Sequence, residues 1–107
     1  MRFVRTKRYE KDLKRIGASD TDALAIETAI AERPEAGDVI KGLHGMRKIR
    51  FGVGGRGKRG GGRAIYFLML ADDVALMLTA YAKNEKDDLT EDDKKALRAL
   101  LKDLIDD

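Results

Sequence analysis

The feature that most constrains the fold of this chain is a change in hydrophobic periodicity near its middle. Up to Pro34 the apolar residues recur at three- and four-residue spacing, which predicts helices. From Met46 onward they alternate with polar residues, which predicts strands. A glycine-rich tract at residues 52 to 62 separates two of these predicted strands and is typical of a hairpin loop. Helices followed by paired strands indicate a mixed domain rather than an all-helical or all-strand one.

The first third of the chain predicts one strand and two helices. Arg2 to Arg5 alternates as a short strand, and a first helix follows that Gly17 closes. Ser19 and Asp22 have the spacing of a capping box, so a second helix is expected from there until Pro34 stops it.

The remainder predicts a sheet and a final helix. Three strands are expected, at Met46 to Phe51, Arg63 to Ala71 and Val74 to Lys83, with a tight turn at Asp72-Asp73 between the last two. A last helix begins at a capping pair, Thr90 and Asp93. We attribute the acidic residues around its start, Asp87, Asp88, Glu91 and Asp92, to the helix dipole.

The predicted fold class is therefore α+β. We expect a small antiparallel sheet of about four strands with a mixed edge, two N-terminal helices and one C-terminal helix. The length of 107 residues fits a single domain, residues 1–107.

Charge is segregated along the chain. The segment from Lys41 to Ala71 contains eight Lys or Arg and no Asp or Glu, whereas the whole chain has a formal net charge of only +3. The remainder is therefore acidic. A concentrated basic segment with an acidic balance elsewhere is typical of proteins that bind nucleic acid or another anionic partner.

The glycine tract has three interpretations. Gly52-x-x-x-x-Gly57-Lys58 approaches a phosphate-binding P-loop, but Arg59 stands where Ser or Thr must hold magnesium, and a strand follows where a helix is needed. We therefore reject a nucleoside triphosphate site. A simple hairpin loop remains, and so does a loop whose cations, Arg56, Lys58 and Arg59, contact a polynucleotide backbone.

Strand alternation predicts a cationic site. Ile49 and Phe51 share one face of their strand with Arg47, whereas Lys48 and Arg50 point to the opposite face. If the helices cover Ile49 and Phe51, the Lys48 face is open, and Arg63 at the start of the next strand can join it there.

Other polar and aromatic candidates follow the last strand. Tyr81 and Lys83 share a face near its end, and Asn84 and Lys86 come next. A packing role and a functional role for Tyr81 are equally supported. For His44 we favour a loop role over catalysis, because it has no orienting carboxylate nearby in sequence.

The composition excludes several classes of protein. The chain has no Cys and one His, which rules out disulfides, a thiolate nucleophile and a zinc site. No apolar region follows the basic N-terminus, and the longest apolar run, Ala64 to Ala71, is too short to span a bilayer. We expect a soluble cytoplasmic protein without metal, cofactor or membrane contact.

The ordered set of motifs from Pro34 to Thr90 is similar to that of the HigB/RelE-type toxins of bacterial type II toxin-antitoxin systems. The similarity is carried by Gly37-Asp38-Val39-Ile40, Gly45-Met46-Arg47-Lys48-Ile49-Arg50, Gly57-Lys58-Arg59-Gly60-Gly61, Ile65-Tyr66 and Tyr81-x-Lys83-Asn84-Glu85-Lys86-x-Asp88-Leu89-Thr90. The resemblance implies an antiparallel sheet with helices against one face. It also implies cleavage of mRNA in the ribosomal A site and neutralisation by a cognate antitoxin, with a free toxin that is monomeric and forms hetero-oligomers with the antitoxin.

Site roles follow from the resemblance. Lys48 and Arg50 match the basic pair that contacts the scissile phosphate, and Arg63 matches the arginine that opens the next strand. Lys48 is then the candidate base, while Tyr81 or Lys83 orients the nucleotide or protonates the leaving oxygen. Expected contacts to RNA or the ribosome are Arg47, Arg56, Lys58, Arg59, Asn84 and Lys86.

A rival from another class is a ParE-like toxin, which shares the fold but inhibits DNA gyrase by binding and cuts nothing. The basic pair together with Arg63 favours cleavage, because a gyrase inhibitor does not need a phosphate-stabilising cluster. A plain RNA-binding module is less well supported, since the chain has only three Phe and three Tyr.

Overall fold

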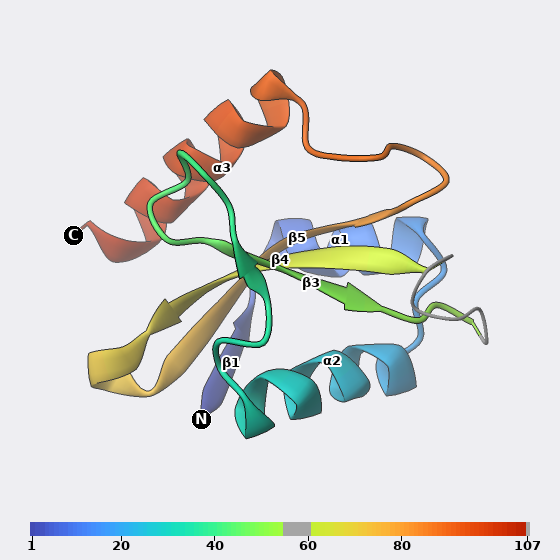
Figure 1. Ribbon diagram of the computed structural model, residues 1–107, viewed down its shortest axis with the longest axis horizontal. Helices are drawn as coiled ribbons and strands as arrows, with labels where there is room; N and C mark the ends of the chain where they lie inside the picture. Colours follow the sequence, from blue (N-terminus) through green and yellow to red (C-terminus); the bar gives the residue numbers. More distant parts are fainter. Residues whose placement is uncertain (55–60, 107) are drawn as a thin grey trace.

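The computed structural model describes residues 1–54 and 61–106 and contains one mixed sheet between helices (Figure 1). The strand order is β1-β5-β4-β3-β2; β1 runs parallel to β5, and the other neighbours are antiparallel. The elements along the chain are β1 (Arg2–Arg5), α1 (Lys7–Arg15), α2 (Asp20–Glu32), β2 (Asp38–Val39), β3 (Arg47–Phe51), β4 (Gly62–Met69), a 3-10 turn η1 (Leu70–Asp72), β5 (Val74–Ala82) and α3 (Glu91–Ile105). The predicted α+β class and its mixed edge are confirmed, with five strands rather than about four.

The predicted helix boundaries are confirmed by their caps. The Ser19 hydroxyl accepts a hydrogen bond from the backbone of Asp22, whose carboxylate accepts one from the backbone of Ser19, and Thr90 forms the same capping box at the start of α3. Helix α2 ends at Glu32, two residues before Pro34, because the residue preceding a proline is sterically excluded from helical geometry. These boundaries depend on local interactions, which explains why the sequence predicts them.

The expectation that helices cover only one face of the sheet is wrong. Helices α1 and α2 pack on one face, where their core includes Tyr9, Ile26 and Ile30. Helix α3 packs on the opposite face through Leu97 and Leu101, and Figure 1 shows α2 and α3 on opposite sides of the sheet. The apolar stripe of α3 needs a partner surface, and the alternating strands provide one on the face that α1 and α2 leave uncovered.

Strand β2 was not predicted from the sequence. The Tyr66 hydroxyl donates to the Pro34 carbonyl at 2.8 Å and accepts from the Gly37 amide at 2.9 Å. A Cβ at Gly37 would lie 2.9 Å from the Lys48 carbonyl oxygen and 2.8 Å from the Tyr66 ring, so only glycine fits. This close approach places Asp38–Val39 beside β3, which adds the fifth strand.

Strands β4 and β5 contain two further departures from the predicted pattern. β4 ends at Met69, and the turn spans η1 and Asp73, which adopts a left-handed conformation with φ of 53°. A β-bulge shifts the register, since Tyr66 pairs with Met77 and Ile65 pairs with Thr79. The extra residue in β5 reverses which side chains face α3 in the second half of that strand.

Candidate nucleic-acid interface

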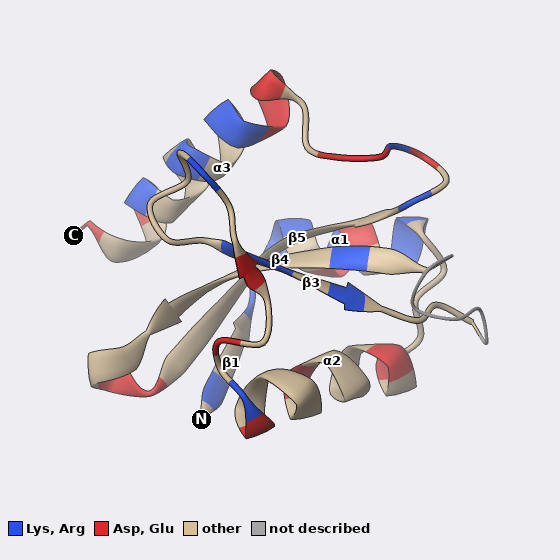
Figure 2. Ribbon diagram, viewed as in Figure 1, with Lys and Arg blue, Asp and Glu red and all other residues tan. Residues whose placement is uncertain are grey.

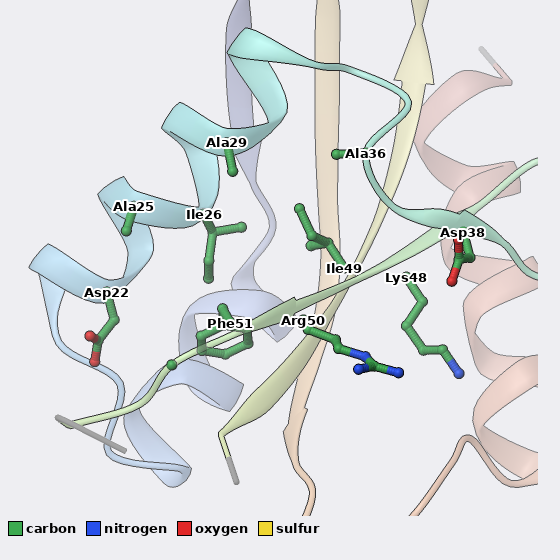
Figure 3. A pocket seen from close by; sticks show the side chains of 11 residues that line it. Asp22, Ala25, Ile26, Ala29, Ala36, Asp38, Lys48, Ile49, Arg50 and Phe51 are labelled. Carbon is green, nitrogen blue, oxygen red and sulfur yellow. The ribbon is translucent and has the colours of Figure 1, made fainter. Parts of the chain in front are cut away.

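The basic side chains of β3 divide between the two faces of the sheet as alternation predicts. Phe51 is buried in the core beneath α1 and α2, and Ile49 packs against the same core. Lys48 and Arg50 point to the opposite side of the strand, away from Ile49 (Figure 3). Beside them, a hollow of about 520 Å³ lies between α2 and β3, and both basic residues line it. Two cations therefore project from one face of a strand that borders an open hollow.

Pairing across the sheet extends this cationic face. Arg50 lies opposite Arg63 in the ladder between β3 and β4, and Arg63 lies opposite Tyr81 in the ladder between β4 and β5. The three side chains therefore form a row across three strands, because directly paired residues share a face. Figure 2 shows basic residues on the neighbouring segments of β3 and β4.

Arg63 does not lie on an open face as expected. Its side chain is buried, with 7% of the residue exposed, and one guanidinium nitrogen donates to the Gly62 carbonyl at 3.0 Å. Arg63 is therefore buried where its ladder partner Arg50 is exposed. Arg63 can support a phosphate site through its charge, but its truncation will also disturb packing.

Arg50 and Lys48 differ in how their charges are paired. Arg50 is exposed, and its side chain makes no hydrogen bond or ion pair with any residue that the structure describes. Lys48 is part-buried, and its ammonium lies 3.4 Å from an Asp88 carboxylate oxygen. The Leu89 amide also donates to this carboxylate at 2.8 Å. This hydrogen bond is the main cause that lowers the pKa of Asp88 below its ordinary value, and the charge of Lys48 lowers it further.

Asp88 is a site residue that the sequence analysis missed. We attributed it to the dipole of the last helix, but that helix begins at Glu91, and its first turn contains Glu91, Asp92 and Asp93. Asp88 lies in the preceding loop and pairs with β3. The pairing joins residues 40 positions apart, so local sequence offered no signal beyond the motif that contains it.

Arg47 points away from the cationic face and has structural partners. Its guanidinium donates to the Gly37 carbonyl at 2.8 Å and lies 3.3 Å from a Glu35 carboxylate oxygen. These contacts fasten the segment before β2 to the sheet. The predicted RNA contact by Arg47 would have to compete with them.

Tyr81 is almost fully buried, with 1% of the residue exposed. The sequence supported a packing role and a functional role equally, and this burial favours packing. Its hydroxyl is buried without a hydrogen bond of normal geometry to any described residue. Burial, with a smaller contribution from the Asp88 carboxylate, raises the pKa of Tyr81 to about 12. The Lys86 ammonium lies 5.4 Å from the centre of the ring and 2.7 Å from an Asp93 oxygen.

The remaining predicted contacts fall into two groups. Lys83 and Asn84 are exposed in the turn after β5, and the Lys83 amide donates to the carbonyl of Gly61, the residue before β4, at 3.0 Å. Arg56, Lys58 and Arg59 lie outside the described residues. Within residues 1–54 and 61–106, no group of three or more acidic, His or Cys side chains could hold a metal ion.

The comparisons with known proteins agree with this architecture. A family described as "RelE toxin of RelE / RelB toxin-antitoxin system" matches residues 1–106. The free-state structure of an Escherichia coli RelE toxin with two arginines replaced by alanine superposes with a TM-score of 0.58 at 13% identity, covering 94% of this chain and 95% of that one. The isolated E. coli RelE toxin superposes with a TM-score of 0.56 at 18% identity, covering 92% and 97%.

The chain therefore belongs to the RelE family, whose members are toxins of toxin-antitoxin systems. The two solved structures support the fold, and the family match confirms the resemblance seen in the sequence. A search of the described helices finds none with the length and apolar character needed to cross a membrane.

Proposed function

We propose that this RelE-family chain is a ribosome-dependent ribonuclease that cleaves mRNA in the ribosomal A site. The observation that carries the proposal is that Lys48, Arg50 and Arg63 share one face of two paired strands. Lys48 and Arg50 project from β3 (Figure 3), and Arg63 is the partner of Arg50 on β4. Arg50 is exposed and has no partner among the described residues. A charge left in this state is suited to an external anion, and a phosphate of RNA is the anion that the family match favours.

The chemistry that suits such a cluster is attack by a ribose 2′-hydroxyl on the adjacent phosphorus. A new bond forms between the 2′-oxygen and phosphorus while the bond from phosphorus to the 5′-oxygen breaks. A base removes the 2′-proton, and an acid protonates the leaving 5′-oxygen. The products are a 2′,3′-cyclic phosphate and a free 5′-hydroxyl, and the cations stabilise the negative charge that develops on the phosphorane.

The burial of each residue supports the part that we propose for it in this reaction. Arg50 contacts the phosphate directly, and the buried Arg63 beside it adds its charge. Lys48, at the rim of the hollow, is the candidate for proton transfer or for a second phosphate contact. Lys83 is the exposed candidate for the leaving oxygen, since the Tyr81 hydroxyl is buried.

The partners follow from the same assignment. A ribosome-dependent nuclease acts in the cytoplasm on ribosome-bound mRNA, and a cognate antitoxin must disable the cationic face. We propose an acidic antitoxin segment that covers or distorts this face in a hetero-oligomer, while the free toxin is a monomer. Association that is insensitive to salt and to reversal of charge at Lys48 and Arg50 would contradict direct electrostatic masking.

Primer extension on cellular mRNA after brief induction tests the reaction. The expected result is new 5′ ends at A-site codons for the wild type, and none for Arg50→Ala. Lys95→Ala is the matched control, because Lys95 is an exposed cation on the α3 helix, and it should cut like the wild type. DNA breaks that depend on gyrase, without mRNA ends, would establish the ParE-like alternative instead.

A further inference from the structure

A second hollow adjoins the cationic face on the other side of Lys48. It has a volume of about 300 Å³ and lies between the β2 segment and the start of α3. Three lysines line it, together with two carboxylates: Lys41, Lys48, Lys94, Asp38 and Asp88. The sequence predicted a site role only for Lys48 among these lysines, because only the fold brings Lys41 and Lys94 beside it.

An anionic group already occupies this lysine pocket. The Asp88 carboxylate accepts from the Leu89 amide at 2.8 Å and lies 3.4 Å from the Lys48 ammonium. The Leu89 amide, Lys48 and Lys94 all favour its charged form and lower its pKa. One backbone donor and at least two ammonium groups are therefore arranged around a single negative charge.

The groups in the lysine pocket can exchange partners without unfolding. The Asp88 side chain is 65% exposed and that of Lys48 is 30% exposed. Lys94 also lies 3.7 Å from Glu91 of its own helix, but that carboxylate is 87% exposed, and such pairs are weak in water. Rotation of the Asp88 side chain would leave three lysines facing one carboxylate.

The two hollows share lining residues on β2 and β3. Lys48 and Asp38 line both of them, whereas Arg50 lines only the hollow beside α2, and Lys94 lines only the lysine pocket. A polynucleotide backbone that has one phosphate at Arg50 can therefore place a neighbouring phosphate in the lysine pocket.

We propose that the lysine pocket is a second phosphate-binding site for the RNA backbone, and that Asp88 is an intramolecular competitor that the phosphate replaces. The inference rests on the proposed function, because it takes RNA as the substrate. Lys41 and Lys94 are then substrate-binding residues, and Asp88 tunes affinity rather than taking part in proton transfer.

Binding of a cleavage-resistant oligonucleotide tests the site without requiring the reaction. A short 2′-O-methyl RNA with a fluorescent label, titrated by anisotropy over a series of salt concentrations, is a suitable probe. Lys94→Ala should weaken binding roughly three- to tenfold and reduce the salt slope by about 0.7, the value for one lost contact to single-stranded phosphate. Lys95→Ala, one residue further along α3, should change neither quantity.

If Asp88 competes with phosphate for the lysines, neutralising it should change the oligonucleotide affinity in the opposite direction from Lys94→Ala. Asp88→Asn should tighten binding roughly three- to tenfold, whereas Asp87→Asn should have no effect, because Asp87 is exposed in the same loop and does not line the pocket. Combining Asp88→Asn with Lys94→Ala should cancel most of the gain in affinity that Asp88→Asn gives alone. Equal affinities for Lys94→Ala and Lys95→Ala, or weaker binding by Asp88→Asn in a protein of unchanged melting temperature, would overturn the proposal.

The outcomes for the pocket and for the nuclease are separable. If induction yields no mRNA cleavage but binding still depends on Lys94 and Asp88, the ribonuclease fails and the phosphate site stands. If mRNA is cut at A-site codons and oligonucleotide binding does not depend on Lys94 or Asp88, the nuclease stands and the proposed phosphate site in the lysine pocket is overturned.

Discussion

Two charged regions on this small protein have opposite arrangements. Beside α1 and the end of β5, Asp12 is buried and accepts from the Thr79 hydroxyl at 2.5 Å and the Ala80 amide at 3.1 Å, and it also pairs with Arg15. Arg15 in turn lies 2.9 Å from Glu85. On the cationic face, Arg50 has no partner among the described residues and Lys48 has one carboxylate at 3.4 Å.

The difference separates charges that stabilise the fold from charges that are available to a ligand. In the α1 region Asp12, Arg15 and Glu85 are matched, and removing the buried Asp12 leaves the Thr79 hydroxyl and the Ala80 amide without their acceptor. On the cationic face positive charge exceeds negative charge in an accessible place, which costs stability through repulsion and suits an external anion. The cost of a substitution should therefore appear as unfolding in the first region and as lost activity in the second.

The largest effect is expected at the cationic face. Arg50→Ala and Lys48→Ala should each lower mRNA cleavage by about 10²- to 10³-fold, the usual loss when one donor to a developing oxyanion is removed. Their melting temperatures should stay close to that of the wild type, because both side chains reach solvent. Cleavage of ribosome-bound mRNA and thermal unfolding measure the two quantities.

Arg63→Ala tests the contrast between lost activity and lost stability at a buried residue in the row that also contains Arg50. Because Arg63 is buried, the variant should lose cleavage and also melt at a lower temperature than Arg50→Ala. A stable Arg63→Ala protein that still cuts at the wild-type rate would show that the site lies elsewhere, and Lys83 and Lys86 would be the next candidates.

In the α1 region, Asp12→Ala should lower the free energy of unfolding by about 2–4 kcal/mol, because the Thr79 hydroxyl, the Ala80 amide and Arg15 each lose an acceptor. Chemical denaturation measures the change, and Asp20→Ala, at an exposed carboxylate on α2, is the control. If the folded fraction of Asp12→Ala still binds the oligonucleotide like the wild type, the two regions are independent. Loss of binding by that folded fraction would show that they are coupled.

An intermediate effect is expected for the glycine-rich loop. Replacing Arg56, Lys58 and Arg59 together by Ala should weaken oligonucleotide binding by about tenfold or more and flatten its salt dependence, with little change in stability. An unchanged salt slope would assign residues 52 to 62 to hairpin connection alone.

A smaller effect is expected at Tyr81, which lies between the two regions. Tyr81→Phe should leave stability unchanged or raise it by up to about 1 kcal/mol, because a buried hydroxyl without a good hydrogen bond is removed. Growth arrest should persist if the ring serves packing. Complete loss of toxicity with an intact fold would restore Tyr81 as a proton donor.

The smallest effect concerns pH. Hydrogen bonds from the Arg15 side chain and, to a smaller extent, from the Ala82 amide lower the pKa of Glu85 below its ordinary value of 4.5. A carboxyl group with a lowered pKa stabilises the fold above its unfolded-state pKa, and the contribution is lost as pH falls through the folded-state value. Wild-type stability should therefore drop more steeply below about pH 4.5 than that of Glu85→Gln, by less than about 1 kcal/mol since the pair is part-exposed. Parallel acid-unfolding curves would contradict this assignment.

Much of this protein follows from sequence because it depends on local stereochemistry. Capping residues at Ser19 and Thr90 define helix starts, and Pro34 defines a helix end. The two-residue period of a strand places Lys48 and Arg50 on one face whatever the strand packs against. The α+β class and the cationic pair of the proposed site were therefore predictable.

Tertiary structure alone decided which charges are available. The bulge in β5 turns Tyr81 toward α3, so a strict alternation from Val74 would place it on the wrong face. Arg63 is buried although its ladder partner Arg50 is exposed, and the Gly37 carbonyl gives Arg47 a structural role. The loop before α3 brings Asp88 to Lys48. Each of these depends on contacts between residues far apart in the chain, and local periodicity carries no information about them.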